Sequence, residues 1–175
     1  MSIRDQSRIR KNKLDVWRQY LELGKSAYEL QQYGIGDKMF KAAAHESGSD
    51  EEMCCALAEI LEGVSDWLAK RDAARSERLY KRAIALYDRI GNDWTNASAC
   101  RILYKLAELS VGRNMHEVAL RYFGKALIVS RRSAELSPQT HLDLLRSLGA
   151  AWSQKGRHQE ALIVHKKTVR ILKNQ

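Results

Sequence analysis

Histidine residues are the side chains of this sequence best suited to metal chemistry, and their spacing decides whether they can do it. His116 and Glu117 begin like the helical two-histidine motif of zinc proteases, but Leu120 stands where the second histidine is needed. His158 and His165 are seven residues apart and share a helix face. No cysteine, aspartate or third histidine completes a metal site at a suitable spacing. We therefore expect these histidines to have packing or surface roles.

Nucleophilic catalysis and phosphate binding have no better support in the sequence. Serines are scattered without a nearby histidine and acid, and no glycine-rich phosphate loop follows a strand. The alternation of apolar and polar residues typical of strands is not found over any useful length. We expect a protein with no enzymatic activity, no metal and no cofactor.

The cysteines and the first residues of the chain bear on its location. Cys54, Cys55 and Cys100 are odd in number, and we interpret them as reduced packing residues, with a redox role as the alternative. The first dozen residues are polar and basic, with no apolar stretch behind them of the kind found in secretory signals. No run approaches the roughly 18–20 apolar residues of a membrane span. These features predict a cytoplasmic protein without a membrane span.

The positive charge of the chain is concentrated in its second half. Residues 1–88 contain 15 basic and 15 acidic side chains, whereas residues 89–175 contain 15 basic and 6 acidic ones. Such an imbalance favours acidic partners through steering, and a solvated face without a particular partner is the alternative. Residues 1–13 form a basic N-terminal arm, either solvated or in contact with an anionic surface. Its basic residues are Arg4, Arg8, Arg10, Lys11 and Lys13.

A repeated spacing of small and aromatic residues indicates the elements that carry these side chains. One proline and only ten glycines favour an all-helical chain. Steps of twelve, four and three residues recur in three copies: Gly24, Gly36, Phe40 and Ala43; Ala107, Ala119, Phe123 and Ala126; Gly149, Ala161, His165 and Thr168. In the remaining copy, Ser76, Tyr80 and Ala83 keep the last two steps. Its first small residue is assigned to Ala58, which predicts six extra residues between the two helices.

The helix-starting signals give approximate boundaries. The apolar periodicity predicts a first helix over about residues 13–32, followed by a turn at 33–36 and a second helix. Ser49 followed by Glu52 predicts a capping box for the third helix. Ser137 before Pro138 predicts the start of the seventh helix, because proline is favoured at the first helical position.

This arrangement resembles the tetratricopeptide repeat (TPR) family over roughly residues 17–173. The best-matching residues are Leu23, Gly24, Tyr33, Gly36, Phe40 and Ala43; Leu106, Ala107, Ala119, Phe123 and Ala126; Leu148, Gly149, Trp152, Gly156 and Ala161. The second helices recur after 40, 43 and 42 residues, longer than the common period of about 34 and more similar to the kinesin-light-chain-like subclass. The resemblance implies an all-α right-handed solenoid, as a single domain over 14–175 with repeats at about 14–48, 49–92, 93–136 and 137–175.

The resemblance also implies a binding surface. In TPR proteins the first helices of successive repeats line a concave groove that holds an extended peptide or a helix of a partner. The matching groove positions are Arg18, Leu21, Lys25, Tyr28, Arg101, Tyr104, Lys105 and Arg146. We expect Tyr104, between Arg101 and Arg146, to be the anchor, because tyrosine and arginine often dominate interface energies. Ordinary solvated helix positions are the alternative reading of these residues.

The sequence therefore predicts a cytoplasmic adaptor or scaffold that binds another protein, with its basic second half favouring an acidic partner. Two alternatives stay open: nucleic-acid or anionic-surface binding by the basic half, and a structural subunit that self-associates. Self-association is expected through the last helix, where we expect partly exposed apolar residues at Val164, Ile171 and Leu172.

Overall fold

The protein is an all-α solenoid, seen in a computed structural model that describes residues 3–91, 97–133 and 136–173. Eight α-helices and no strand occur in these ranges, and none of these helices combines the length and apolar character needed to cross a membrane. The helices are α1 (Ile3–Glu29), α2 (Tyr33–Ser47), α3 (Glu51–Leu68), α4 (Ala73–Arg89), α5 (Ala97–Gly112), α6 (His116–Arg132), α7 (Pro138–Gln154) and α8 (His158–Lys173). The predicted fold class is confirmed.

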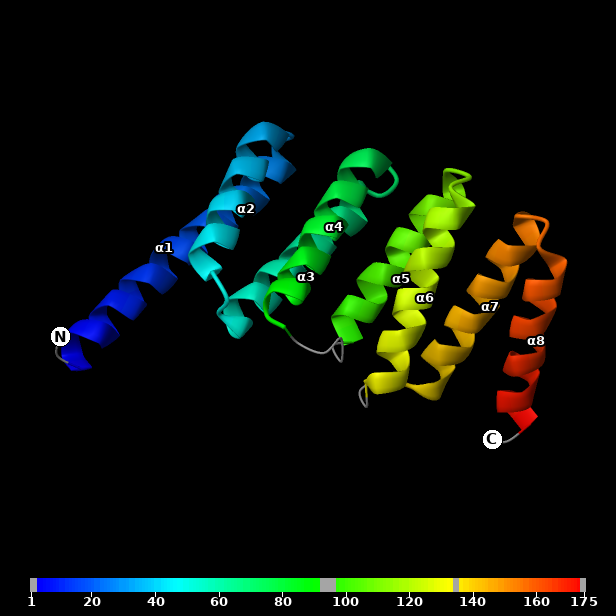
Figure 1. Ribbon diagram of the computed structural model, residues 1–175. Coiled ribbons are helices and arrows are strands. Elements are labelled where there is room, and N and C mark those ends of the chain that lie inside the picture. The colour runs from blue at the N-terminus through cyan, green and yellow to red at the C-terminus, as the bar shows by residue number, and fades with distance from the viewer. Residues whose placement is uncertain (1–2, 92–96, 134–135, 174–175) are drawn as a thin grey trace.

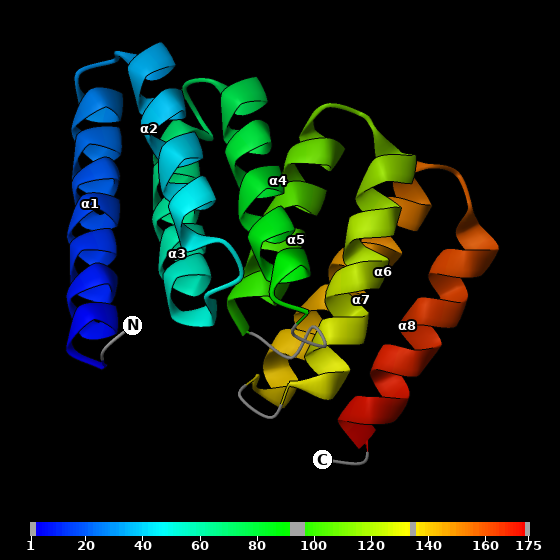
Figure 2. The ribbon, with the colours of Figure 1, turned by 60° about the vertical axis from the view of Figure 1, so that its left-hand side comes forward.

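The helices form four antiparallel hairpins that stand side by side in a row (Figure 1). The first helices α1, α3, α5 and α7 form one layer, and the second helices form the other (Figure 2). Gln31, Asn114 and Gly156 take a left-handed conformation in the turns of three hairpins, with φ of 59°, 58° and 77°. The turn predicted at 33–36 is wrong, because α2 already begins at Tyr33 and the chain reverses at Gln31.

Close approach of the paired helices depends on glycine in the first and last hairpins. A Cβ on Gly24 would lie 2.5 Å from Cε1 of Phe40, and one on Gly36 would meet the ring of Tyr28. A Cβ on Gly149 would lie 2.7 Å from Cε1 of His165. The aromatic or imidazole ring of one helix thus occupies the space that a side chain on the other would need. Most other small and aromatic residues of the pattern are buried, whereas Tyr33 and Trp152 are partly exposed and Gly156 and His165 are exposed. The buried ones are Phe40, Ala43, Ala58, Tyr80, Ala83, Ala107, Ala119, Phe123, Ala126, Ala161 and Thr168.

The second hairpin contains no insertion between its helices, so the six extra residues predicted there are wrong. The Ser76 hydroxyl donates to the backbone oxygen of Ser65 at 2.9 Å. In the first hairpin a Cβ on Gly36 would lie 3.2 Å from the backbone oxygen of Gly24, which makes Ser65 the counterpart of Gly24. Ala58 is buried two helical turns earlier and is a core residue rather than the point of close approach. The first helices therefore repeat after 41, 42 and 42 residues, at Gly24, Ser65, Ala107 and Gly149.

Helix caps and boundaries differ from prediction at two places. Asp50 caps α3, because its side chain accepts from the Met53 amide at 3.0 Å, so the capping box at Ser49 is wrong. Helix α1 begins at Ile3, ten residues before the predicted start, so residues 3–13 of the predicted basic arm are part of this helix. Ser137 caps α7 as predicted, accepting from the Thr140 amide. The predicted repeat boundary at 92/93 lies outside the described residues.

Candidate functional site

The first two hairpins are joined by polar contacts between α2 and α4, and a space remains between the first helices α1 and α3. Asp37 on α2 accepts from the Arg82 guanidinium of α4 at 2.6 Å and from the Tyr28 hydroxyl at 2.9 Å. The Arg89 guanidinium of α4 donates to the backbone oxygen of Ala44 at 2.6 Å. Helices α1 and α3, by contrast, contact each other only sparsely.

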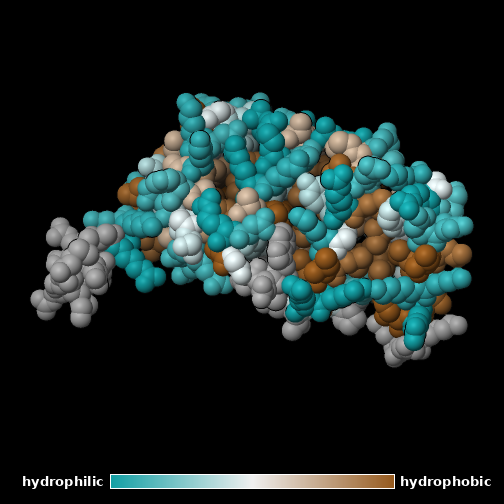
Figure 3. All heavy atoms as spheres, viewed as in Figure 1, coloured by the Kyte–Doolittle hydropathy of each residue, from teal (hydrophilic) through white to brown (hydrophobic). Residues whose placement is uncertain are grey.

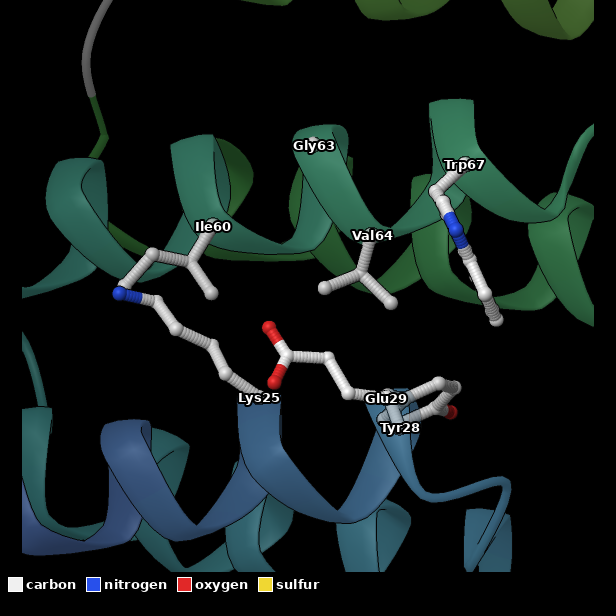
Figure 4. A pocket seen from close by; sticks show the side chains of 7 residues that line it. All are labelled: Lys25, Tyr28, Glu29, Ile60, Gly63, Val64 and Trp67. Carbon is white, nitrogen blue, oxygen red and sulfur yellow. The ribbon is translucent and has the colours of Figure 1, made fainter.

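A cavity of about 370 Å³ occupies the space between α1 and α3. Ile60, Val64 and Trp67 recur at steps of three and four along α3, so they share one face and point towards α1 (Figure 4). Gly63 lies on the same face, and nothing comes within 4 Å of the position that its Cβ would take. The wall from α3 is therefore apolar, and the missing side chain of Gly63 deepens it.

The rim of this cavity on the α1 side carries both charges. Lys25 and Glu29 extend from α1 towards α3 (Figure 4), and Lys25 also pairs with Glu22 at 3.1 Å. Trp67 lies at the far end, with the Arg71 guanidinium over its ring at 4.4 Å. An apolar wall with a few polar groups at its edge is the usual composition of a binding site.

The groove between α3 and α5 is closed by ion pairs. The guanidinium of Arg101 donates to both carboxylate oxygens of Glu62 at 3.3 Å, and the ammonium of Lys105 donates to Glu62 at 3.0 Å and to Asp66 at 2.6 Å. The Glu62 side chain is only 8% exposed. The hydrogen bond to Glu62 raises the pKa of Arg101. Desolvation lowers the pKa of Lys105, but the bonds to Asp66 and Glu62 outweigh this effect and raise that pKa.

These ion pairs change the predicted role of two groove residues. Arg101 and Lys105 were expected to attract an acidic partner, but Glu62 and Asp66 already neutralise them. The sequence contained a signal for this arrangement. Glu62 precedes Arg101 by 39 residues and Lys105 by 43, close to one repeat, so these side chains take neighbouring positions on adjacent first helices.

A second cavity, of about 300 Å³, lies between α5 and α7, and Tyr104 is among the residues that line it. The Tyr104 hydroxyl lies 3.3 Å from the Ser147 hydroxyl, and its ring meets the edge of Phe123 at 5.9 Å between centroids. Burial raises the pKa of Tyr104. Arg146 pairs with Asp143 on its own helix at 3.2 Å, with both side chains about half exposed.

The remaining predicted groove residues divide into exposed and buried ones. Arg18 is exposed and Lys25 is partly exposed. Leu21 and Tyr28 are buried in the core, so Leu21 does not belong to an open groove, whereas Tyr28 lines the cavity between α1 and α3. Sequence reasoning missed Ile60, Val64 and Trp67, whose apolar periodicity is the same as that of core residues.

Chemistry beyond binding has little geometric support. No group of three or more histidine, cysteine, aspartate or glutamate residues that could hold a metal ion occurs within the ranges that the structure describes. Cys54, Cys55 and Cys100 are free, and burial raises the pKa of the Cys100 thiol to about 11. Burial also raises the pKa of Cys55. Because the thiolate is the reactive form, these shifts disfavour a redox role.

Comparison with known proteins identifies the fold. No family model matches the chain, and no curated protein matches it. BtubC (BKLC) from P. vanneervenii is similar in structure, with a TM-score of 0.63 and 18% identity over 89% of this chain and 62% of that one. Two structures of MamA have TM-scores of 0.52 and 0.51 and identities of 16% and 18%; they cover 90% and 99% of this chain, and 92% and 96% of their own.

The chain spans only about 62% of the length of BtubC, so that likeness concerns part of the larger protein. At these identities the comparisons show the fold alone. The neighbours have a TPR-like helical repeat fold. This protein has the TPR-like α-solenoid fold.

Proposed function

We propose that this protein is a non-enzymatic interaction module that binds a helix or an extended segment of a partner on its layer of first helices. The observation that carries the proposal is the cavity between α1 and α3, with Ile60, Val64 and Trp67 as its apolar wall. An apolar side chain of the partner fills this cavity. Lys25 and Glu29 at the rim then contact polar groups beside that side chain.

The energetics favour an apolar anchor at this position. Binding sites concentrate their energy in a few well-desolvated contacts surrounded by a polar rim. Trp67 is the largest apolar side chain in the wall and is 39% exposed, so an incoming side chain buries surface that water now covers. The volume of about 370 Å³ accommodates a side chain of the leucine or aromatic class together with adjoining backbone.

The charge of the second half sets a preference for acidic segments in the partner. Because Arg101 and Lys105 are neutralised by Glu62 and Asp66, this preference acts through long-range steering by the other basic residues rather than through a specific clamp. We expect the association rate to fall as salt rises, while the dissociation rate depends on the apolar anchor.

Substitution of Gly63 tests the proposal with little risk to the fold. Leucine at Gly63 extends into the cavity, and its Cβ meets open space, since no atom lies within 4 Å of that position. Gly124 on α6 is equally unobstructed and lies far along the row, so Gly124→Leu is the matched control. Peptides selected from a displayed library against the wild-type protein are the probe.

We expect Gly63→Leu to weaken binding of the selected peptides at least tenfold, and Gly124→Leu to leave it unchanged. Calorimetry or fluorescence anisotropy measures both. Equal binding by the two variants would remove the cavity from the proposal. Failure to select any peptide, with a fully folded protein on the support, would count against the whole layer of first helices as a binding surface.

A second candidate function, binding of nucleic acid or another polyanion, is favoured by a basic cluster at one end of the hairpin row. Burial lowers the pKa of Lys167, and repulsion from Arg131 lowers it further. The pKa of His141 is lowered by burial and by repulsion from Arg131 and Lys167. The basic side chains of α6 and α8 thus lie close enough to repel. This candidate requires an affinity that falls steeply with salt, because phosphate contacts release counterions. Nucleic-acid binding that salt leaves unchanged would eliminate it.

We also propose a cytoplasmic location and membership of the longer-period TPR subclass. Three free cysteines, two of them fully buried, support a reducing compartment. The spacing of 41, 42 and 42 residues between first helices supports the subclass. Fractionation of cells that produce the protein, with thiol labelling of each fraction, tests the first of these proposals.

A further inference from the structure

The outer face of α1 is an uncharged stripe with exposed leucines. Val16, Leu23 and Leu30 follow one another at seven-residue intervals, and Leu23 and Leu30 are 56% and 68% exposed. Such a spacing places side chains on a single face. The other exposed residues on that face are also uncharged: Asn12, Gln19 and Ser26. An apolar stripe from which charge is absent is typical of the core of an interface.

The interior hairpins show what this face does when a hairpin precedes it. Arg113, directly after the end of α5, has the position of Leu30, which directly follows α1, and it pairs with Glu77 on α4. Lys155, directly after the end of α7, has that same position and pairs with Glu117 on α6. His141 on α7 has the position of Val16 and lies 2.7 Å from the Ser130 hydroxyl of α6. In the third and fourth hairpins this stripe of the first helix therefore faces the second helix of the preceding hairpin. In the second hairpin, Val64 has the position of Leu23 and lines the cavity between α1 and α3.

Burial confirms the same relationship. Leu106 has the position of Leu23 in the third hairpin and is fully buried, as is Ala99 at the position of Val16. The hairpins share their internal packing, so this additional burial comes from the neighbouring hairpin. In α1 the corresponding side chains are left exposed.

The outer face of α8 is the complementary half of the same interface. Leu162 and Val169 are 53% and 50% exposed, and apolar surface is visible at the end of the row formed by α7 and α8 (Figure 3). Ile84 on α4 and Leu127 on α6 have the position of Val169, and each is only 8% exposed. Val164 and Ile171 are partly exposed, as expected, and the side chain of Leu172 lies outside the described part.

The two faces also match in the residues that would meet. Leu162 has the position of Glu77, the residue that pairs with Arg113 between the second and third hairpins. Leu30 has the position of Arg113. The ionic pair of the interior is thus replaced at the two outer faces by two exposed leucines, which can stack on each other only if the faces come from different molecules.

We propose that a second copy of this chain docks head to tail, with the outer face of its α1 on the outer face of α8. The contact repeats the interface that the molecule already forms between its own hairpins, so a second copy fits it in shape and in register. Because the two faces differ, the contact is heterologous and leaves a free face at each end. Association continues into open-ended assemblies that lengthen with concentration. This inference does not depend on the cavity between α1 and α3.

Two single substitutions and their mixture test the proposal. Leu23→Glu blocks the face of α1, and Val169→Glu blocks the face of α8; both side chains are at least half exposed, so the fold is expected to persist. Ile128→Glu on α6 is the matched control, since Ile128 is 53% exposed but lies on neither face. Sedimentation velocity over a hundredfold concentration range gives the assembly size, and circular dichroism gives the fold.

We expect the wild type and Ile128→Glu to form assemblies that grow with concentration, and each blocked variant to be monomeric. An equimolar mixture of the two blocked variants keeps one intact face of each kind and therefore gives a dimer that grows no further. A wild type that is monomeric throughout would overturn the proposal. So would a Val169→Glu variant that still dimerises, because that result would place α1 against α1 in a symmetric contact.

Discussion

Gly24 offers a quantitative test of how the hairpins pack. Its backbone is helical, so propensity alone makes alanine more stable than glycine there by about 1 kcal/mol. The structure opposes this gain, because the new Cβ would lie 2.5 Å from Cε1 and 2.7 Å from Cδ1 of Phe40. Ordinary carbon contacts need about 3.5–4.0 Å, so the ring or the helix must move by about 1 Å.

Phe40 has little room to move, since it is 2% exposed and stacks on Tyr28. Overpacking of this kind costs about 1–3 kcal/mol. After the gain in helix propensity, we expect Gly24→Ala to lower the free energy of unfolding by up to about 2 kcal/mol. Gly63→Ala, with open space around its Cβ, should raise it by up to about 1 kcal/mol.

Chemical denaturation followed by circular dichroism measures both variants. At about 2–4 °C per kcal/mol for a chain of this size, the two substitutions shift the melting temperature in opposite directions. Phe40→Leu in the Gly24→Ala background should recover part of the loss by removing the ring. If Gly24→Ala were as stable as Gly63→Ala, the close approach of α1 and α2 would be refuted.

Three further predictions concern charge, pH and assembly. Glu62→Gln should cost about 1 kcal/mol, because it removes the charge from the buried side chain that accepts from the partly exposed cations Arg101 and Lys105. Glu117→Gln in the exposed pair with Lys155 should change stability little, as denaturation curves will show. Burial lowers the pKa of His141, so the unfolded protein binds a proton at this residue more readily than the folded protein does. The contribution of His141 to stability is therefore complete above pH ~6.5 and is lost as the pH falls below it. His141→Gln should reduce this loss of stability at low pH, as measured by thermal melts between about pH 5 and 8. Leu30→Arg and Leu162→Glu should each weaken assembly tenfold or more. The double variant should restore assembly, because it recreates the Arg113–Glu77 pair between the two outer faces. If sedimentation shows that the double variant assembles as weakly as the single ones, the proposed alignment of the two faces is contradicted.

The repeat architecture could be predicted because small and aromatic residues must recur wherever two helices approach closely. The pattern failed at Ala58, which is small, buried and two helical turns from Ser65. Periodicity cannot distinguish two such residues, because both lie on the same face. The distinction comes from a polar contact: the buried Ser76 hydroxyl needs an acceptor and finds the backbone oxygen of Ser65.

The candidate site was harder to predict, for two physical reasons. Ile60, Val64 and Trp67 have the spacing of core residues, and that they line a cavity depends on how the first hairpin packs against the second. Arg101 and Lys105 were placed correctly on the first helices, but their charge is balanced by residues one repeat earlier. Spacing within a repeat locates a side chain, whereas its availability depends on the neighbouring repeat.

The sparse contact between α1 and α3 has a consequence for how the molecule opens. In a row of hairpins each unit is stabilised by its own packing and by its nearest neighbours, so cooperativity is limited by the least extensive junction. Within the described residues, that junction lies between the first and second hairpins. Amide hydrogens of α1 and α2 should therefore exchange with solvent through local opening, at a lower free energy than those of α5 and α6. A ligand held across the junction would slow that exchange and couple the first hairpin to the rest.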